Sequence, residues 1–206
     1  MAARTVLCYG DSNTYGWNAE TGGRFPRDIR WPGVLAAQLG DTWHVIEEGL
    51  GGRTTVHDDP FLPHANGLTY LVPCLRSHAP LDVVVLFLGV NDLKAYLGLP
   101  AAAVARGVGL LVQETLAGGA GPDGGPPRVL VLGLPRLGRF DAEDEQFEGV
   151  AAKMERLPVL LAETASDLGV DFLDLAPVTA FGDVDGRHLD AAGHAALGRA
   201  VAAALT

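Results

Sequence analysis

Three residues with complementary chemistry lie just outside apolar stretches of the 206-residue chain. Ser12 follows the apolar run that ends at Gly10, and Asp185 and His188 share the short sequence DGRH. A serine hydroxyl is a weak nucleophile that needs an adjacent base, and histidine is the usual base because its pKa lies near neutrality. The histidine in turn needs an acceptor on its second ring nitrogen. These residue types predict attack by Ser12 on a carbonyl carbon, with His188 as base and Asp185 as its partner.

Such an attack creates an oxyanion, which needs hydrogen-bond donors already in place. The candidates are the backbone N–H groups of Ser12 and Gly52 and the side-chain amide of Asn91. Gly52 suits this role because a backbone without a Cβ atom can approach a ligand closely. We expect Asp11 to cap or brace the loop that holds Ser12.

Each of these motifs has a simpler interpretation when it is taken alone. Gly-Asp-Ser is most often a turn, Gly51-Gly52 a loop, VND a helix N-cap, and DGRH a turn with a solvated histidine. Their joint occurrence, each behind an expected strand or before an expected helix, favours one shared site.

The elements that must position these residues alternate along the chain. Short apolar runs predict strands at 4–10, 43–49, 81–89, 127–135 and 170–175, and helical spacing predicts helices at 31–40, 67–78, 101–118, 157–169 and 190–205. This alternation predicts βαβ units and a parallel sheet covered by helices, within one domain over 1–206. In such a sheet the ligand crevice lies at the carboxyl ends of the strands, where the candidate residues follow.

Two connecting segments do not follow the alternation. The Gly- and Pro-rich stretch 118–127 is expected to be a flexible connection rather than a domain boundary. The partly acidic stretch 136–157 is less regular, which is typical of a loop that covers a substrate.

The composition excludes several classes of function. A formal net charge of −10, with Lys94 and Lys153 as the only lysines, argues against nucleic acid and anionic membrane surfaces as partners. No apolar run is long enough to span a bilayer, and Cys8 and Cys74 read as buried thiols rather than a disulfide framework. We therefore expect a reduced, cytoplasmic protein.

A metal site is not expected from the sequence. The group His57-Asp58-Asp59 with His64 lacks a helical i, i+4 arrangement or a cysteine pair. No metal and no cofactor are therefore expected.

Four sequence blocks together resemble those of the SGNH hydrolases, the GDSL-type esterases and lipases. They are YGDSNT (9–14), GLGGRTT (49–55), LGVNDL (88–93) and DGRHL (185–189). The resemblance implies a three-layer, flavodoxin-like α/β fold with a five-stranded parallel sheet. It also implies a Ser12-His188-Asp185 triad with Gly52 and Asn91 as oxyanion donors. The first block of the family usually has Leu after Ser, whereas this chain has Asn13, a departure that we expect to be small.

Within that family the chain is most similar to bacterial arylesterases that also transfer acyl groups to alcohols in water. This similarity implies an apolar acyl pocket, small-molecule ester and alcohol substrates, and a homo-oligomer between a dimer and an octamer. Trp17, Val90 and Leu93 are expected to form apolar walls of the pocket. Lys94 is a candidate for the pocket mouth, although a solvated lysine is its more ordinary interpretation.

Two other functions remain open at this point. A carbohydrate acetylesterase or a thioesterase would use the same fold and residues, and a non-catalytic flavodoxin-like binding module belongs to a different class. Labelling by an organophosphonate would separate the serine enzymes from the binding module, because the reaction needs an activated serine.

Overall fold

A five-stranded parallel sheet forms the centre of the protein. The computed structural model describes residues 3–139 and 145–206. The strand order across the sheet is β4 (Trp43–Gly49), β1 (Arg4–Gly10), β5 (Val83–Phe87), β6 (Arg128–Leu132) and β7 (Asp171–Leu173). All neighbouring pairs in this sheet are parallel, as the alternation of elements predicts.

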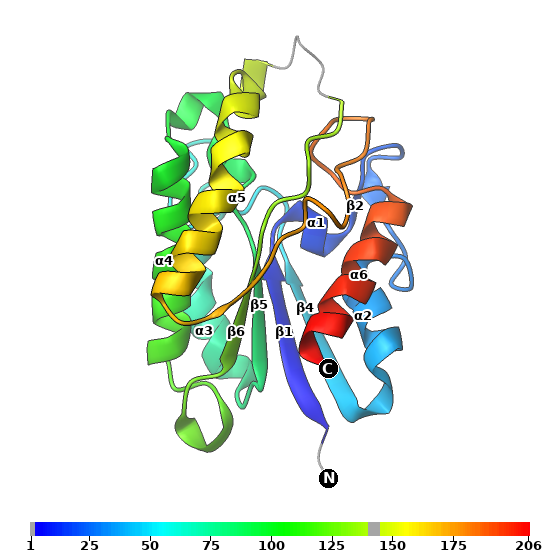
Figure 1. Ribbon diagram of the computed structural model, residues 1–206, viewed down its shortest axis with the longest axis vertical. Coiled ribbons are helices and arrows are strands. Elements are labelled where there is room, and N and C mark those ends of the chain that lie inside the picture. The colour runs from blue at the N-terminus through cyan, green and yellow to red at the C-terminus, as the bar shows by residue number, and fades with distance from the viewer. Residues whose placement is uncertain (1–2, 140–144) are drawn as a thin grey trace.

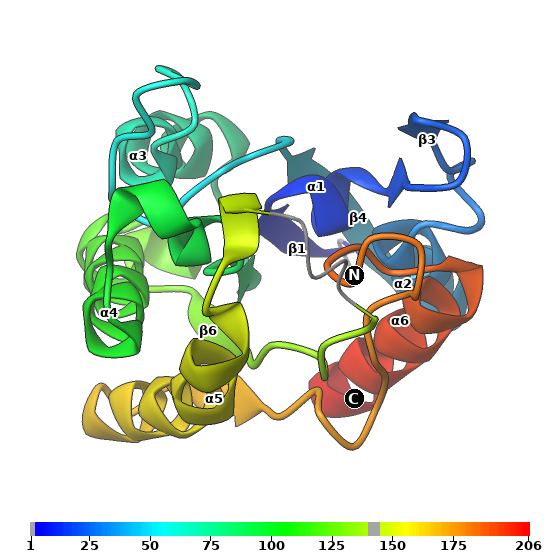
Figure 2. The same ribbon diagram turned by 90° about the horizontal axis from the view of Figure 1, so that it is seen from above.

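Helices cover both faces of the sheet, which gives three layers (Figures 1 and 2). One face carries α2 (Trp31–Leu39) and α6 (Ala191–Leu205), and the other carries α3 (Gly67–His78), α4 (Ala101–Ala117) and α5 (Val150–Asp167). Strand β5 is buried at every position, because both of its faces pack against helices. The predicted α/β fold with a five-stranded parallel sheet is confirmed.

The register of the sheet brings the candidate segments to one edge. Gly10, the last residue of β1, pairs with Gly49 on one side and with Phe87 on the other. Three chain segments therefore leave the sheet at the same level, and they carry Ser12, Gly52 and Asn91. This is the carboxyl edge, where ligands of open parallel sheets bind.

Several elements differ from the sequence prediction. The four-residue helix α1 (Ser12–Tyr15) and the hairpin of β2 (Trp17–Asn18) and β3 (Gly23–Arg24) were not predicted. Strands β5, β6 and β7 are shorter than expected, whereas β1 and β4 have the predicted bounds. A 3₁₀ turn at Pro122–Gly124 lies within the stretch expected to be flexible.

The segment 136–157 is more regular than the sequence suggests. Helix α5 begins at Val150 rather than near Leu157 and continues through Pro158. Val150, Met154 and Leu157 are buried, so their packing extends the helix backwards past the proline. Residues 140–144 of the expected covering loop lie outside the described residues.

Short 3₁₀ helices complete the described chain, at Gly40–Thr42, Asn91–Leu93, Ala95–Leu97 and Glu145–Phe147. Within residues 3–139 and 145–206, no helix has the length and apolar character needed to cross a membrane.

Candidate active site

Ser12 is the first residue of α1 and lies directly beyond strand β1. The carboxylate of Asp11 caps this short helix by accepting a hydrogen bond from the backbone N–H of Asn13 at 2.8 Å. Gly10 permits the sharp exit from the strand, because a Cβ atom there would lie 2.1 Å from Oγ1 of Thr14. The expectation that Asp11 braces the Ser12 loop agrees with this geometry. Burial raises the pKa of Asp11 to about 6, although the Asn13 hydrogen bond and His188 oppose the shift.

His188 lies between Ser12 and Asp185. Its Nε2 atom is 2.9 Å from Oγ of Ser12, and its Nδ1 atom is 2.6 Å from Oδ2 of Asp185. The other oxygen of Asp185 accepts the backbone N–H groups of Arg187 and His188, at 3.2 and 3.1 Å. The structure therefore joins the three residues in one chain of hydrogen bonds.

The Asp185 carboxyl group remains ionised over the usual pH range. Burial raises its pKa, but the hydrogen bond and charge of His188 and two backbone N–H groups outweigh burial and bring the pKa to about 2. An ionised Asp185 keeps the proton of His188 on Nδ1. The free lone pair of Nε2 then faces the Ser12 hydroxyl, which is the arrangement a general base needs.

The two further oxyanion candidates line the same cavity as Ser12. This cavity has a volume of about 220 Å³ and is lined by Ser12, Trp17, Gly51, Gly52, Val90, Asn91, Lys94, Gln146, Phe147, Arg187 and His188. Gly52 has φ 76°, and a Cβ atom there would meet Cδ1 of Leu62 at 2.5 Å. The amide nitrogen of Asn91 donates to the carbonyl of Arg53 at 3.1 Å and to Asp11 at 3.3 Å. Both N–H groups of the Asn91 amide are thus engaged, so Asn91 can donate to an oxyanion only when one of these two contacts opens. The cavity brings together a hydroxyl, an imidazole and the loop of Gly52.

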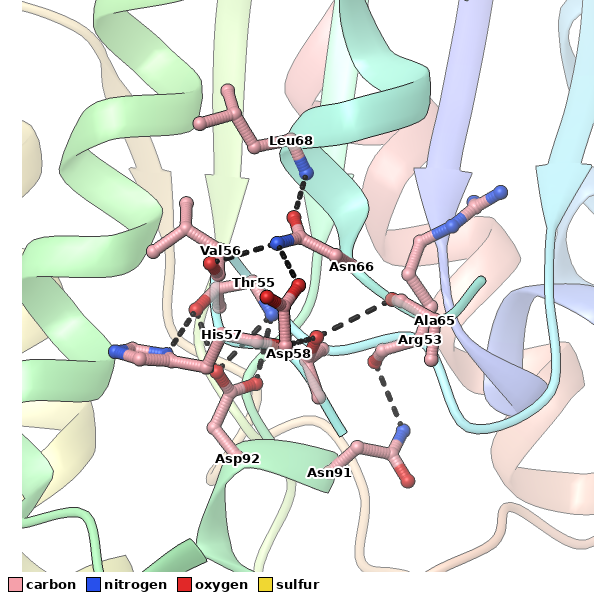
Figure 3. Close-up of polar contacts among 11 residues, drawn as sticks. Arg53, Thr55, Val56, His57, Asp58, Ala65, Asn66, Leu68, Asn91 and Asp92 are labelled. Carbon is pink, nitrogen blue, oxygen red and sulfur yellow. Dashed lines mark hydrogen bonds and ion pairs between the residues drawn. The ribbon is translucent and has the colours of Figure 1, made fainter. Parts of the chain in front are cut away.

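Asp92, next to Asn91, ties this segment to the one that follows Gly52 (Figure 3). Its fully buried carboxylate accepts the backbone N–H of Thr55 at 2.9 Å and the Thr55 hydroxyl at 2.6 Å. The Nδ1 atom of His57 lies 2.9 Å from the same carboxylate, and this hydrogen bond raises the pKa of His57. The two segments that carry Gly52 and Asn91 are thus held together by buried polar contacts.

A second buried carboxylate, on the segment that follows Gly52, binds residues of the segment that follows Asn91. Asp59 lies on the segment after Gly52, is 1% exposed, and accepts from Nζ of Lys94 and from the hydroxyl of Tyr96, both at 2.8 Å. Farther along that segment, Asn66 caps α3 by accepting the N–H of Leu68 (Figure 3). The buried ion pair of Lys94 and Asp59 is costly to separate, because removal of either residue would leave the other as a lone buried charge.

The structure corrects one expectation about the pocket, that of Leu93. Lys94 lines the cavity, where it is 4% exposed and paired with Asp59 rather than solvated. Leu93 is fully buried in the hydrophobic core and does not line the cavity, because the 3₁₀ turn at Asn91–Leu93 directs its side chain inward. Trp17 and Val90 line the cavity as expected.

Arg53 is a part of the site that the sequence pattern did not predict. The contacts of Asn13, which join α1 to the loop of His188, were not predicted either. Arg53 is 3% exposed, donates to the carbonyls of Gly10 (2.8 Å) and Glu48, and places its guanidinium 4.2 Å from the centre of the Tyr9 ring. It thereby braces the end of β1. Its position beside Gly52 was the available signal, since a buried arginine must be paired.

One group among the described residues has the donors for a metal ion. Glu48, Cys74 and His78 place their ligand atoms within 4.8 Å of one another. Nε2 of His78 already lies 2.9 Å from the Glu48 carboxylate, and burial raises the pKa of Cys74 to about 12. None of the three lines the Ser12 cavity, so they would not hold a catalytic metal there.

A larger cavity of about 620 Å³ lies on another side of His188. It is lined by the β2–β3 hairpin, residues 182–184 and the start of α6. Neither Ser12 nor Asn91 lines it, so we place the chemistry in the smaller cavity.

Comparison with known proteins points to one family. A family model described as GDSL-like lipase/acylhydrolase matches residues 8–196. The solved structure of an aryl esterase from M. smegmatis is 41% identical, with 98% of each chain covered and a TM-score of 0.92. Est24, a carbohydrate acetylesterase from Sinorhizobium meliloti, is 40% identical over 98% of this chain and 100% of that chain, with a TM-score of 0.92. No curated protein matches the chain.

Proposed function

Because this chain belongs to the GDSL-like lipase/acylhydrolase family, an esterase or acylhydrolase family, we propose that it cleaves small aryl or short-chain acyl esters through an acyl-enzyme on Ser12. The observation that carries this proposal is the chain of two hydrogen bonds through His188. Its Nε2 atom lies 2.9 Å from the Ser12 hydroxyl, and its Nδ1 atom lies 2.6 Å from the Asp185 carboxylate. A non-catalytic binding module would have no use for this arrangement.

In the proposed mechanism, Ser12 Oγ attacks the ester carbonyl while Nε2 of His188 takes the hydroxyl proton. Asp185 stabilises the imidazolium that forms. The N–H groups of Ser12 and Gly52 bind the oxyanion, together with one N–H of Asn91 that leaves its contact with Arg53 or Asp11. His188 then donates its proton to the leaving alcohol, and the C–O bond of the ester breaks to leave the acyl group on Ser12.

The acyl-enzyme has two proposed fates. Water or an alcohol attacks its carbonyl, again with His188 as base. The bond between the acyl group and Ser12 Oγ then breaks, His188 returns the proton to Ser12, and a free acid or a new ester leaves. The apolar side chains of Trp17 and Val90 in the cavity wall support binding of an alcohol. Each buried CH₂ group favours binding by about 0.8 kcal/mol, which does not by itself offset the much higher concentration of water. Transfer therefore also requires that water enters the site slowly.

A carbohydrate acetylesterase is the second candidate. It is supported by the similarity to Est24 and by a cavity of about 220 Å³, which is small enough to favour a short acyl group. Both candidates use the same residues and differ only in the alcohol part of the ester.

A rate survey tests the proposal. Wild-type protein and Ser12→Ala are assayed on p-nitrophenyl acetate, p-nitrophenyl octanoate, acetylated sugars and an acyl thioester. We expect hydrolysis of short aryl esters by the wild type alone, together with labelling of Ser12 by an organophosphonate. Equal activity of Ser12→Ala would refute the mechanism, and higher kcat/KM on acetylated sugars would favour the second candidate.

Acyl transfer is tested separately with vinyl acetate and benzyl alcohol in aqueous buffer. The ratio of benzyl acetate to free acid is measured at early times, before the product is hydrolysed. We expect measurable ester, and a shift toward acid in Trp17→Gln. If acid alone forms up to saturating alcohol, the protein is a hydrolase without transferase activity.

We also propose that the protein forms a homo-oligomer. Phe61, which is 72% exposed, packs edge-to-face on the exposed ring of Tyr96, whose hydroxyl bonds Asp59 near the cavity. Such aromatic residues are enriched in protein interfaces. Light scattering over a wide concentration range tests the assembly, and a monomeric mass throughout would contradict it.

A further inference from the structure

The side chain of Asn13 bonds to the residues on both sides of His188. Its amide nitrogen donates to the carbonyl of Arg187 at 3.1 Å, and its amide oxygen accepts the N–H of Leu189 at 2.9 Å. Both contacts join positions 174 to 176 residues apart, and Asn13 itself is 1% exposed.

The chemistry of the partners determines the orientation of the Asn13 amide. A backbone carbonyl can only accept a hydrogen bond, and a backbone N–H can only donate one. The amide nitrogen must therefore face Arg187 and the amide oxygen must face Leu189. An apolar side chain could make neither contact, and a carboxylate could make only the second.

The hydrogen bonds of Asp185 do not join the loop of His188 to α1. It bonds Nδ1 of His188 and the N–H groups of Arg187 and His188, but all three residues belong to one loop. These bonds set the tautomer and the ring orientation of His188 within that loop. They do not set the distance between the loop and Ser12.

Asn13, by contrast, is covalently joined to Ser12. Its own N–H is held by the Asp11 cap, so α1 is a fixed base for the amide. Among the hydrogen bonds of residues 3–139 and 145–206, those of Asn13 and the Ser12–His188 contact connect α1 with the loop of His188.

We propose that Asn13 is a positioning residue that holds the His188 backbone at the distance from Ser12 that proton transfer requires. This inference rests on the proposed esterase function. The Asn13 amide forms hydrogen bonds to the residues immediately before and after His188. Loss of these bonds lets the imidazole move away from the Ser12 hydroxyl. A misplacement of about 1 Å in a catalytic arrangement can cost about 10²-fold in rate.

The test is kinetic, with Asn13→Leu as the main variant because leucine is similar in size and has no polar atoms. We expect kcat on a short p-nitrophenyl ester to fall by about 10²-fold, with little change in KM. Asn13→Asp keeps the acceptor for Leu189 but loses the donor for Arg187, so we expect a kcat between those of the wild type and Asn13→Leu. It also provides a second variant should Asn13→Leu fold poorly.

A double-mutant cycle separates positioning from general destabilisation. If Asn13 acts through His188, Asn13→Leu should cost no further kcat in a His188→Ala background. Val112→Ala, a buried change in α4, serves as the stability control and should lower the melting temperature without lowering kcat. An equal loss of kcat from Asn13→Leu in both backgrounds would overturn the proposal, as would wild-type kcat in a folded Asn13→Leu protein.

The same assays distinguish this failure from failure of the proposed function. If the wild type shows Ser12-dependent hydrolysis and Asn13→Leu retains it fully, Asn13 alone loses its role. If hydrolysis by the wild type does not depend on Ser12, the proposed function and the role of Asn13 fall together.

Discussion

The Ser12 hydroxyl lies 2.9 Å from Nε2 of His188, although 176 positions separate the two residues in the chain. Ser12 follows strand β1 and His188 precedes helix α6, so the contact spans the two ends of the molecule's sequence. The distance is that of a formed hydrogen bond. The base is thus already within reach of the nucleophile.

This contact predicts how the residues of the triad respond to substitution. Ser12→Ala and His188→Ala should each lower kcat by about 10⁴-fold or more, with unchanged circular dichroism. The double variant should lose little beyond either single one, because the two residues act as a unit. Initial rates with a p-nitrophenyl ester provide the measurement, and near-normal turnover by Ser12→Ala would contradict the prediction.

Asn91→Ala tests the oxyanion donor. We expect kcat to fall by about 10²–10³-fold, the range for removal of one such donor, with little change in KM. The reason is that the oxyanion exists in the transition state and not in the bound ester. A raised KM with an unchanged kcat would show that Asn91 binds the substrate in its ground state.

Gly52 and Gly51 form a matched pair of substitutions. Gly52 has φ 76° and would place a Cβ atom 2.5 Å from Leu62, whereas Gly51 has open space and no such conformation. Gly52→Ala should therefore distort the loop that carries the proposed N–H donor and lower kcat, while Gly51→Ala should retain it. Similar kinetics for the two variants would argue against a role for Gly52.

The Thr55–Asp92 contact predicts a difference between two small substitutions. Thr55→Val has nearly the same shape but removes the hydroxyl that donates to buried Asp92 at 2.6 Å, whereas Thr55→Ser keeps it. Asp92 keeps the backbone N–H of Thr55 and Nδ1 of His57, so the loss is that of one hydrogen bond to a charged group, about 1.5–3 kcal/mol. We expect Thr55→Val to lower both the free energy of unfolding and kcat, and Thr55→Ser to stay near the wild type in kcat. Urea denaturation and initial rates test this. Equal kcat values for Thr55→Val and Thr55→Ser would show that the Thr55–Asp92 hydrogen bond does not contribute to catalysis.

His194 predicts a pH dependence of stability. Burial lowers its pKa from 6.5 to about 4; Arg30 and His188 also lower it, and Asp190 opposes them. Between these values the unfolded chain binds a proton that the folded protein does not bind. Stability is therefore full above about pH 6.5 and falls toward pH 4, by on the order of 3 kcal/mol.

His194→Asn provides the comparison, since its amide oxygen can still accept the N–H of Trp31, which bonds Nδ1 of His194 at 3.3 Å. We expect a flatter curve of unfolding free energy between pH 6.5 and pH 4 in this variant. Parallel curves for the wild type and His194→Asn would contradict the assignment of this slope to His194.

The features that depend on local patterns could be predicted from the amino-acid sequence. Short apolar runs predicted all five strands of the central sheet. The runs of β5 and β6 are almost wholly apolar, because strands buried on both faces have no polar side. Residues directly behind those strands must share an edge in a parallel sheet. For that reason the positions of Ser12, Gly52 and Asn91 behind three strands are enough to assign them to one site.

The long-range partners of these segments follow from the tertiary fold and could not be predicted from the sequence. The burial of Lys94 against Asp59, the inward direction of Leu93, and the hydrogen bonds of Asn13 on both sides of His188 each depend on contacts between distant segments. A single chain carries no spacing signal for such pairs, since many polar residues have the right chemistry and the fold selects among them. Asn13 departs from the usual first block, and its amide acquires a partner only when the last loop folds back onto α1.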